Sequence, residues 1–244
     1  MQKSSIERVL RGGADSSPLN KRFTGFTLAE VLITLGIIGV VAALTLPTLI
    51  GNYQKKQTVT KLQKAFTVLN QAYRLSYNDL GEADSAELEE ITSEEYFEKY
   101  WKPYIKYTKV CTSYSDCGYT SNNPFYTLKG DVASYSFMSG NTRVAFYSPD
   151  GFLYQVFWKY TDGKPLNLII VDINGSQKPN VVGKDIFSFT RTKDGFINTL
   201  GAGLTDEVVN KSCSVNEGAP NLSASYCAEK IRRDGWEISE DYPW

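Results

Sequence analysis

The feature that most constrains this chain is a stretch of 24 uncharged residues, 31–54, which starts directly behind a single acid, Glu30. About 20 apolar helical residues are enough to cross the hydrocarbon core of a bilayer. The stretch therefore predicts one membrane-spanning helix. A carboxylate inside such a helix costs about 2.5 to 3.5 kcal/mol on insertion scales, so Glu30 calls for a contact that compensates this cost.

The residues before the apolar stretch carry a second signal. Residues 21–30 read KRFTGFTLAE, and Pro47 lies just before the apolar run ends. This segment resembles the processing site of type IV prepilins and of the pseudopilins of type II secretion systems. In that family a prepilin peptidase cuts after the glycine and methylates the new amino terminus. The resemblance implies cleavage between Gly25 and Phe26, N-methylation of Phe26, and assembly through Phe26, Glu30 and Pro47.

A physical argument agrees with the role in assembly. Cleavage would leave the amine of Phe26 and the carboxylate of Glu30 close together in sequence, and both would be poorly solvated in the membrane. A pair between Phe26 of one copy and Glu30 of a neighbour would stabilise both charges, and the gain grows as the local dielectric falls. The alternative is that Glu30 sits at the membrane edge and reaches water.

The first 25 residues are expected to be a leader that is removed. They hold five basic and two acidic side chains, a net charge of +3, which is typical of a cytoplasmic flank. A leader of this length with Gly12, Gly13 and Pro18 is long for the family, and the true start codon is left open. The rivals are an ordinary signal peptide cut at residues 41–43 and an uncleaved signal anchor, although the apolar run continues to Ile50.

The chain divides into four predicted parts: leader 1–25, transmembrane and filament-core helix 26–54, amphipathic continuation 55–80, and a head 81–244 outside the cytoplasm. Pro47 should bend or locally melt the helix. Apolar residues then recur at spacings of three, four or seven and predict a face that packs on a sheet: Val59, Leu62, Phe66, Leu69, Tyr73 and Leu80. Gly81 is expected to end the helix.

The sequence pattern of the head is typical of a small α+β domain. A short helix is expected at 93–101, with Ser93 as its cap. Strands are predicted at 135–138, 143–148, 152–159 and 166–173, and shorter ones at 186–190 and 196–199. The fold class is therefore α+β: a long N-terminal helix packed on an antiparallel sheet of about four strands, the lollipop of pilin-like proteins.

The segment 172–185 is a candidate calcium site. It holds Asp172, Asn174, Asn180 and Asp185, whose side-chain oxygens could wrap a cation that takes six to eight oxygen ligands. Major pseudopilins, which this chain resembles, carry calcium in a loop after their strands. The alternative is ordinary turn chemistry, in which the two aspartates cap backbone amides. No other cofactor is expected.

The four cysteines are typical of an oxidising compartment. Pairing of nearest neighbours gives the disulfides Cys111–Cys117 and Cys213–Cys227, although four cysteines allow three pairings. The second bond resembles the C-terminal disulfide loop of many pilins. A zinc site is not expected, because the chain has no histidine and the cysteine spacings are too wide.

The functional prediction is a structural subunit. The sequence has no histidine and contains no phosphate loop, dinucleotide fingerprint or paired-cysteine redox motif, so it offers no support for an enzyme. Residues 26–244 carry a net charge of −4, which argues against general nucleic-acid binding.

The resemblance implies a subunit of a type IV pilus-like or type II secretion pseudopilus filament. Its partners would be prepilin peptidase, other copies or related subunits, an inner-membrane assembly platform and the lipid bilayer. The protein would first sit in the bacterial inner membrane as a single-pass protein with its head outside the cytoplasm, and then in the filament. The rival is a membrane-anchored extracytoplasmic binding or enzyme domain. Which filament uses the subunit, and whether it is major or minor, is left open.

Overall fold

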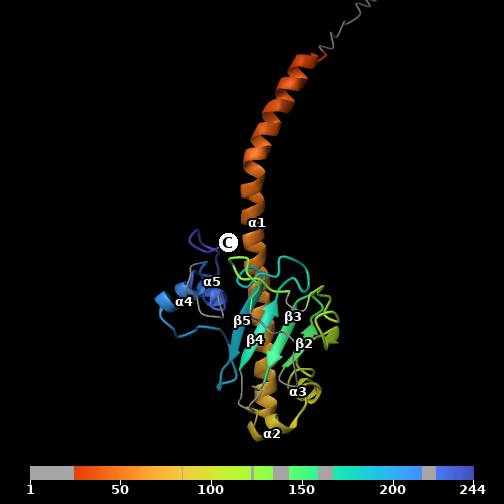
Figure 1. The fold of residues 1–244 in the computed structure, drawn as a ribbon, viewed down its shortest axis with the longest axis vertical. Helices are drawn as coiled ribbons and strands as arrows, with labels where there is room; N and C mark the ends of the chain where they lie inside the picture. The colour runs from red at the N-terminus through yellow and green to blue at the C-terminus, as the bar shows by residue number, and fades with distance from the viewer. Residues whose placement is uncertain (1–24, 84, 122–123, 134–142, 159–166, 216–223) are drawn as a thin grey trace, which may run out of the picture. The chain divides into compact units, whose positions relative to one another are not determined.

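The computed structural model describes residues 25–83, 85–121, 124–133, 143–158, 167–215 and 224–244. The chain forms two compact units, residues 1–48 and 49–244. Helix α1 (Leu28–Leu80) begins in the first unit and ends in the second. The strands and the other helices all belong to the second unit (Figure 1).

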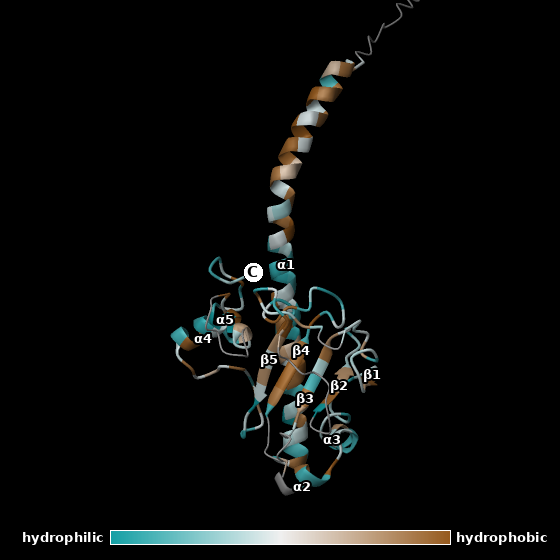
Figure 2. Cartoon of the chain, in the orientation of Figure 1, coloured by the Kyte–Doolittle hydropathy of each residue, from teal (hydrophilic) through white to brown (hydrophobic). Residues whose placement is uncertain are grey.

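The start of α1 is mostly apolar, and in Figure 2 brown turns predominate there, with white ones between them and a teal segment near the beginning. The fourteen large apolar side chains between Phe26 and Ile50 are each 41 to 87% exposed. Moving such side chains out of water yields about 1.5 to 3 kcal/mol each when they are fully buried, so this surface requires lipid or other helices. By length and composition α1 is able to cross a membrane. The helix continues through Pro47, so the predicted local melting is not observed.

The second half of α1 packs through one face, as predicted. Its buried residues are Val59, Leu62, Ala65, Leu69, Ala72 and Ser76. Phe66 and Tyr73 are partly buried against the same core, but Leu80 is 41% exposed, so its predicted place in the face was wrong. Gly81 ends the helix with a φ of +76°, and its N–H donates to the carbonyl of Tyr77 at 2.8 Å.

The sheet in the described part of the chain has six antiparallel strands in sequence order. They are β1 (Lys109–Cys111), β2 (Arg143–Tyr147), β3 (Leu153–Phe157), β4 (Leu168–Asp172), β5 (Ile186–Arg191) and β6 (Ile197–Thr199). All five residues of β3 are buried, so both faces of the sheet are covered. The α+β fold class is confirmed, with six strands instead of about four. The strand predicted at 135–138 lies outside the described residues.

Helix α1 is held to the sheet by specific contacts. The ring of Phe66 stacks on that of Phe189 in β5, with centroids 5.8 Å apart. The side chain of Asn70 accepts from the N–H of Ile197 at 2.9 Å and donates to its carbonyl at 3.2 Å. Asn70 therefore occupies hydrogen-bonding groups at the exposed edge of the short strand β6, where a further strand could otherwise pair.

The described part of the head also contains four short helices: α2 (Ser85–Glu90), α3 (Ser93–Tyr100), α4 (Asp206–Ser212) and α5 (Cys227–Arg233). The residue that caps α3 is Thr92, not Ser93 as predicted. Thr92 and Glu95 form a reciprocal capping box, in which each side chain accepts from the backbone N–H of the other. Strand β1 and helices α2, α4 and α5 were not predicted.

Helix α5 is tied to the sheet through a buried carboxylate. Glu229 accepts from the hydroxyl of Thr199 in β6, from Arg232 at 2.7 and 2.8 Å, and from Arg233 at 2.6 Å. Burial alone would raise the pKa of Glu229, but these hydrogen bonds outweigh it and lower the pKa to about 2. The charged form of Glu229 therefore helps hold α5 on the edge of the sheet.

Candidate processing and assembly site

The residues around the predicted cleavage site form the cap of α1. The carboxylate of Glu30 accepts from the backbone N–H of Thr27 at 2.8 Å and from its hydroxyl at 2.8 Å. The backbone N–H of Glu30 donates to the Thr27 hydroxyl at 3.2 Å. This is the same capping box that starts α3. The pattern Thr-x-x-Glu is visible in the sequence, but its capping role was not predicted.

The capping box leaves part of the carboxylate available. Both bonds from Thr27 end on Oε2 of Glu30, and Oε1 has no hydrogen bond within the described ranges. Cleavage between Gly25 and Phe26 would break the peptide bond before Phe26, so the N–H of Thr27 would survive it. Glu30 can therefore cap its own helix and accept from an outside cation at the same time.

The segment at the predicted cut is open. Gly25, Phe26 and Thr27 precede the first helical residue, and the side chain of Phe26 is 87% exposed. A Cβ atom added at Gly25 would meet nothing within 4 Å, and the same holds for Gly36 and Gly39 in the apolar part of α1. Uncovered backbone outside a helix is what a peptidase needs to reach the scissile bond, and a Cβ atom at Gly25 would not clash with the described residues.

Two family models match the chain. Residues 20–46 match the prokaryotic N-terminal methylation motif. This match, together with the apolar start of α1 and the α+β head, makes the protein a membrane-anchored, type IV pilin-like precursor of the kind that prepilin peptidase processes. Over residues 48–244 the chain belongs to a family of unknown function (DUF6613). No curated protein and no solved structure matches it.

The predicted calcium ligands lie together in the head, in a segment called here the aspartate loop, residues 172–185. Asp185 accepts from the backbone N–H of Asn180 at 2.7 Å and of Val181 at 2.6 Å, and from the side-chain amide of Asn174 at 3.1 Å. Asp172 accepts from the hydroxyl of Tyr119 at 2.7 Å. These are the bonds of a rigid turn, which was the alternative interpretation of the loop.

The geometry gives the calcium site only partial support. The carboxylate oxygens already accept from N–H and O–H donors, and the described residues contain no group of three histidine, cysteine or acidic side chains that could hold a metal. Two side-chain oxygens, those of Asn174 and Asn180, have no hydrogen-bond partner there. Calcium takes six to eight oxygens, so the four residues do not form a complete site, and calcium binding stays a prediction.

Burial affects the two acids of the aspartate loop strongly. Burial raises the pKa of Asp185 to about 6, although its hydrogen bonds act in the opposite direction. Burial, and then the charge of Asp185, raise the pKa of Asp172 well above its usual range. The charged forms are therefore costly in the folded head, and a bound cation would reduce this cost.

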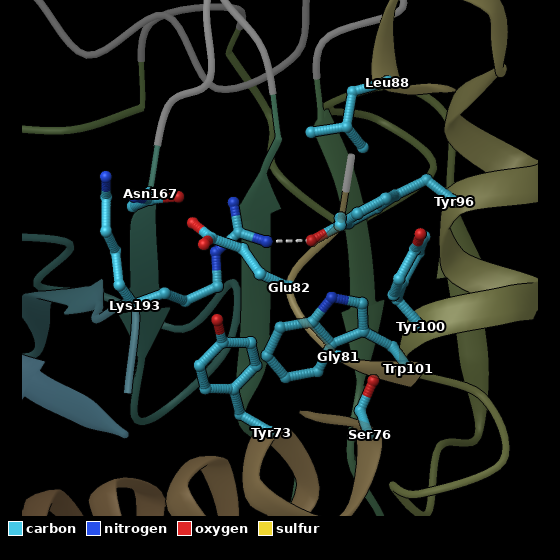
Figure 3. A pocket seen from close by; sticks show the side chains of 12 residues that line it. Tyr73, Ser76, Gly81, Glu82, Leu88, Tyr96, Tyr100, Trp101, Asn167 and Lys193 are labelled. Carbon is cyan, nitrogen blue, oxygen red and sulfur yellow. Dashed lines mark hydrogen bonds between the residues drawn. The ribbon is translucent and has the colours of Figure 1, made fainter. Parts of the chain in front are cut away.

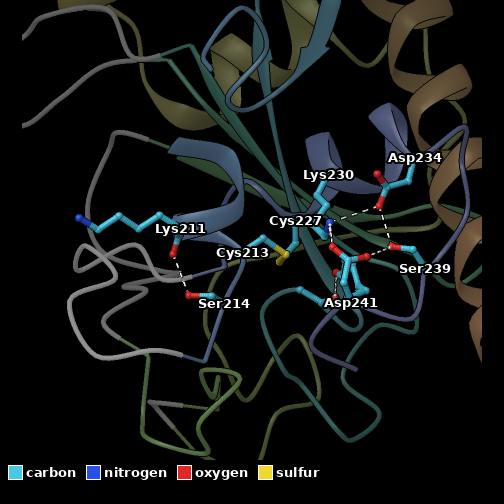
Figure 4. Close-up of a disulfide and its surroundings, with 10 residues drawn as sticks. Lys211, Cys213, Ser214, Cys227, Lys230, Asp234, Ser239 and Asp241 are labelled. Carbon is cyan, nitrogen blue, oxygen red and sulfur yellow. Dashed lines mark hydrogen bonds and ion pairs between the residues drawn. A yellow bond between two sulfur atoms is a disulfide. The ribbon is translucent and has the colours of Figure 1, made fainter. Parts of the chain in front are cut away.

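One of the two predicted disulfides is present. Cys213 and Cys227 are bonded across a sequence separation of 14, which joins the end of α4 to the start of α5 (Figure 4). Cys111 and Cys117 are buried free thiols, so the predicted bond between them is absent. A hydrogen bond to Cys111, and then burial, raise the pKa of Cys117. This disfavours the thiolate that oxidation requires.

Proposed function

We propose that this protein is a structural subunit of a type IV pilus-like or type II secretion pseudopilus filament. Prepilin peptidase cuts between Gly25 and Phe26, and the mature chain polymerises through the start of α1. The observation that carries the proposal is the combination of the methylation motif with an apolar helix surface that no other described residue covers.

The proposed assembly contact joins two copies. The N-methylated amine of Phe26 on an incoming subunit pairs with Glu30 of a neighbour, and Oε1 of Glu30 is the acceptor that its own cap leaves over. In a medium of low dielectric this pair stabilises two charges that would otherwise be buried alone. Gly36 and Gly39 let the backbone of a neighbouring helix approach closely, because their surroundings are open.

Intact-mass measurement of the membrane-extracted protein tests the cleavage. The expected species starts at Phe26 and carries one methyl group. A Gly25→Leu variant should keep its leader, and the cause would be peptidase recognition, since an added Cβ atom at Gly25 meets nothing within 4 Å among the described residues. A Gly36→Leu variant is the matched control and should be cut normally. A Leu44 terminus, an intact Met1 in the unaltered protein, or normal cutting of the Gly25 variant would contradict the proposal.

A further inference from the structure

The head contains a cavity that the proposed filament role does not use. It has a volume of about 420 Å³, within the range of small-molecule sites. It is lined by the last turns of α1, the segment that follows α1, helices α2 and α3, and the end of β5 (Figure 3). All of these belong to the unit formed by residues 49–244.

Aromatic rings make up much of the wall. Tyr73 comes from α1, Tyr96 and Tyr100 from α3, and Trp101 from the residue after α3. The rings of Tyr73 and Trp101 are nearly parallel, with centroids 6.2 Å apart. The Tyr73 hydroxyl donates to the carbonyl of Thr192 at 3.2 Å, and the Tyr96 ring stacks on Trp158 with centroids 4.9 Å apart. The wall is therefore a packed aromatic surface, which suits the edge or face of another aromatic ring.

Three polar side chains of the cavity, those of Trp101, Arg191 and Lys193, can only donate. Trp101 is 1% exposed, and its indole N–H has no hydrogen-bond partner among the described residues. In Figure 3 the indole nitrogen points toward the middle of the cavity. An indole N–H can only donate, and leaving it unpaired in a buried place is costly. The cavity therefore calls for an acceptor atom beside Trp101.

Two cations strengthen this requirement. Arg191 is 8% exposed and is positioned by its bonds to the Tyr96 hydroxyl and, at 2.6 Å, to the carbonyl of Phe157. Lys193 lies at the exposed rim. The one acid among the lining residues that the structure describes is Glu82, so the net charge of this lining is +1. A donor-only N–H in a lining with net positive charge favours an anionic acceptor, since hydrogen bonds to charged groups are the stronger ones.

We propose that this cavity binds a small carboxylate that carries an aromatic ring. The carboxylate accepts from Trp101 near the guanidinium of Arg191, and its ring stacks among the tyrosines. A free aromatic acid and the C-terminal residue of a polypeptide both present this chemistry. The site is separate from the assembly segment, so it does not depend on the proposed filament role.

The test is calorimetric titration of the full chain in detergent micelles. The probes are phenylacetate, its neutral isostere phenylacetamide, and N-acetylphenylalanine as a model of a polypeptide end. Phenylacetate should bind one to one, and phenylacetamide at least about tenfold more weakly because it lacks the charge. Tighter binding of N-acetylphenylalanine would identify a polypeptide end as the ligand, and preference for phenylacetate would identify a free acid.

Variants test whether the donor groups of the cavity bind the ligand, without removing the rings that pack in the fold. Trp101→Phe keeps a ring but removes the N–H and should weaken binding of phenylacetate about tenfold. Lys193→Gln should weaken it about threefold and reduce its salt dependence. Lys211→Gln, an exposed lysine on α4 that does not line the cavity, is the control. Three results would overturn the proposal. They are the absence of saturable phenylacetate binding up to about 10 mM, roughly the weakest affinity of interest, equal binding of phenylacetate and phenylacetamide, and unchanged phenylacetate binding in Trp101→Phe.

Discussion

Replacing Glu30 with glutamine separates its two possible roles. Glutamine keeps the capping box, because the third helical position accepts either Glu or Gln, but it removes the charge. Thr27→Val does the reverse: it removes the hydroxyl of the box and keeps the carboxylate. Comparison of the two variants therefore distinguishes an acid that pairs with a neighbouring subunit from an acid that only caps its own helix.

The two roles differ in magnitude. The box at Thr27 has bonds of 2.8, 2.8 and 3.2 Å, and the box at Thr92 has bonds of 2.8, 3.0 and 3.2 Å. Loss of such a cap costs about 1 kcal/mol, or roughly a fivefold change in an equilibrium. A pair of unit charges about 4 Å apart at an effective dielectric of 20 gains about 4 kcal/mol. This corresponds to roughly a thousandfold change in subunit addition.

The assay compares the variants at matched expression. The membrane fraction reports insertion, which should be normal in all of them, and the sheared filament fraction reports assembly. Glu30→Gln should leave filaments below detection, whereas Thr27→Val should reduce them about fivefold or less. Glu95→Gln makes the same exchange in the cap of α3 in the head and should leave assembly unchanged. Normal filaments from Glu30→Gln, or equal losses in Glu30→Gln and Thr27→Val, would refute the intersubunit pair.

Three further predictions concern the head. Replacing Cys213 and Cys227 together with alanine should lower the free energy of unfolding by about 3 kcal/mol, measured by urea denaturation; an unchanged midpoint would show that the bond is absent in solution. The folded-state pKa of Glu229 is lowered to about 2, so its stabilisation is complete above its usual pKa and is lost as the pH falls from about 4.5 to 2. The pKa of Asp185 is raised to about 6, so stability falls as the pH rises from about 4 to 6. Together the two acids predict that the free energy of unfolding is largest near pH 4 to 5. In Glu229→Gln this free energy should fall less steeply as the pH is lowered below that range. A free energy of unfolding that increases steadily up to pH 7 would contradict this. If the aspartate loop binds calcium, an ion concentration ten times the dissociation constant should add about 1.4 kcal/mol at pH 7, and Asp185→Asn should remove that gain; no shift in the unaltered protein would exclude the site.

Local sequence signals predicted the elements whose structure depends on residues that are close together in the chain. The spacing of Leu62 and Leu69 identified the packed face of α1, and Gly81 marked its end because glycine adopts a positive φ without strain. Strands β2 to β6 followed from β-branched and aromatic runs between turn residues. The cap at Thr27 is equally local, since Thr-x-x-Glu is a helix-start pattern, but the prediction assigned Glu30 to assembly or, alternatively, to the membrane edge.

Other features were not readable from short segments. Strand β1 is three residues long, and α4 and α5 have seven residues each, which is too short for a periodic pattern to emerge. Helix α5 is held by the bonds of Glu229 to a strand 30 residues earlier in the chain. Isolated helices of this length are marginal in water, so their presence depends on contacts that sequence windows do not contain.

The sequence alone determined that this chain has an apolar helix with one acid at its front and an N-terminal methylation motif, because these depend on residues next to one another. The tertiary structure decided which polar groups from distant parts of the chain lie next to one another. It joined Asp185 to the turn of the aspartate loop, left Cys111 and Cys117 without a disulfide bond, and placed Trp101 and Arg191 on one cavity. Burial costs and pKa values depend on neighbours brought together by folding, and no spacing along the chain specifies those neighbours.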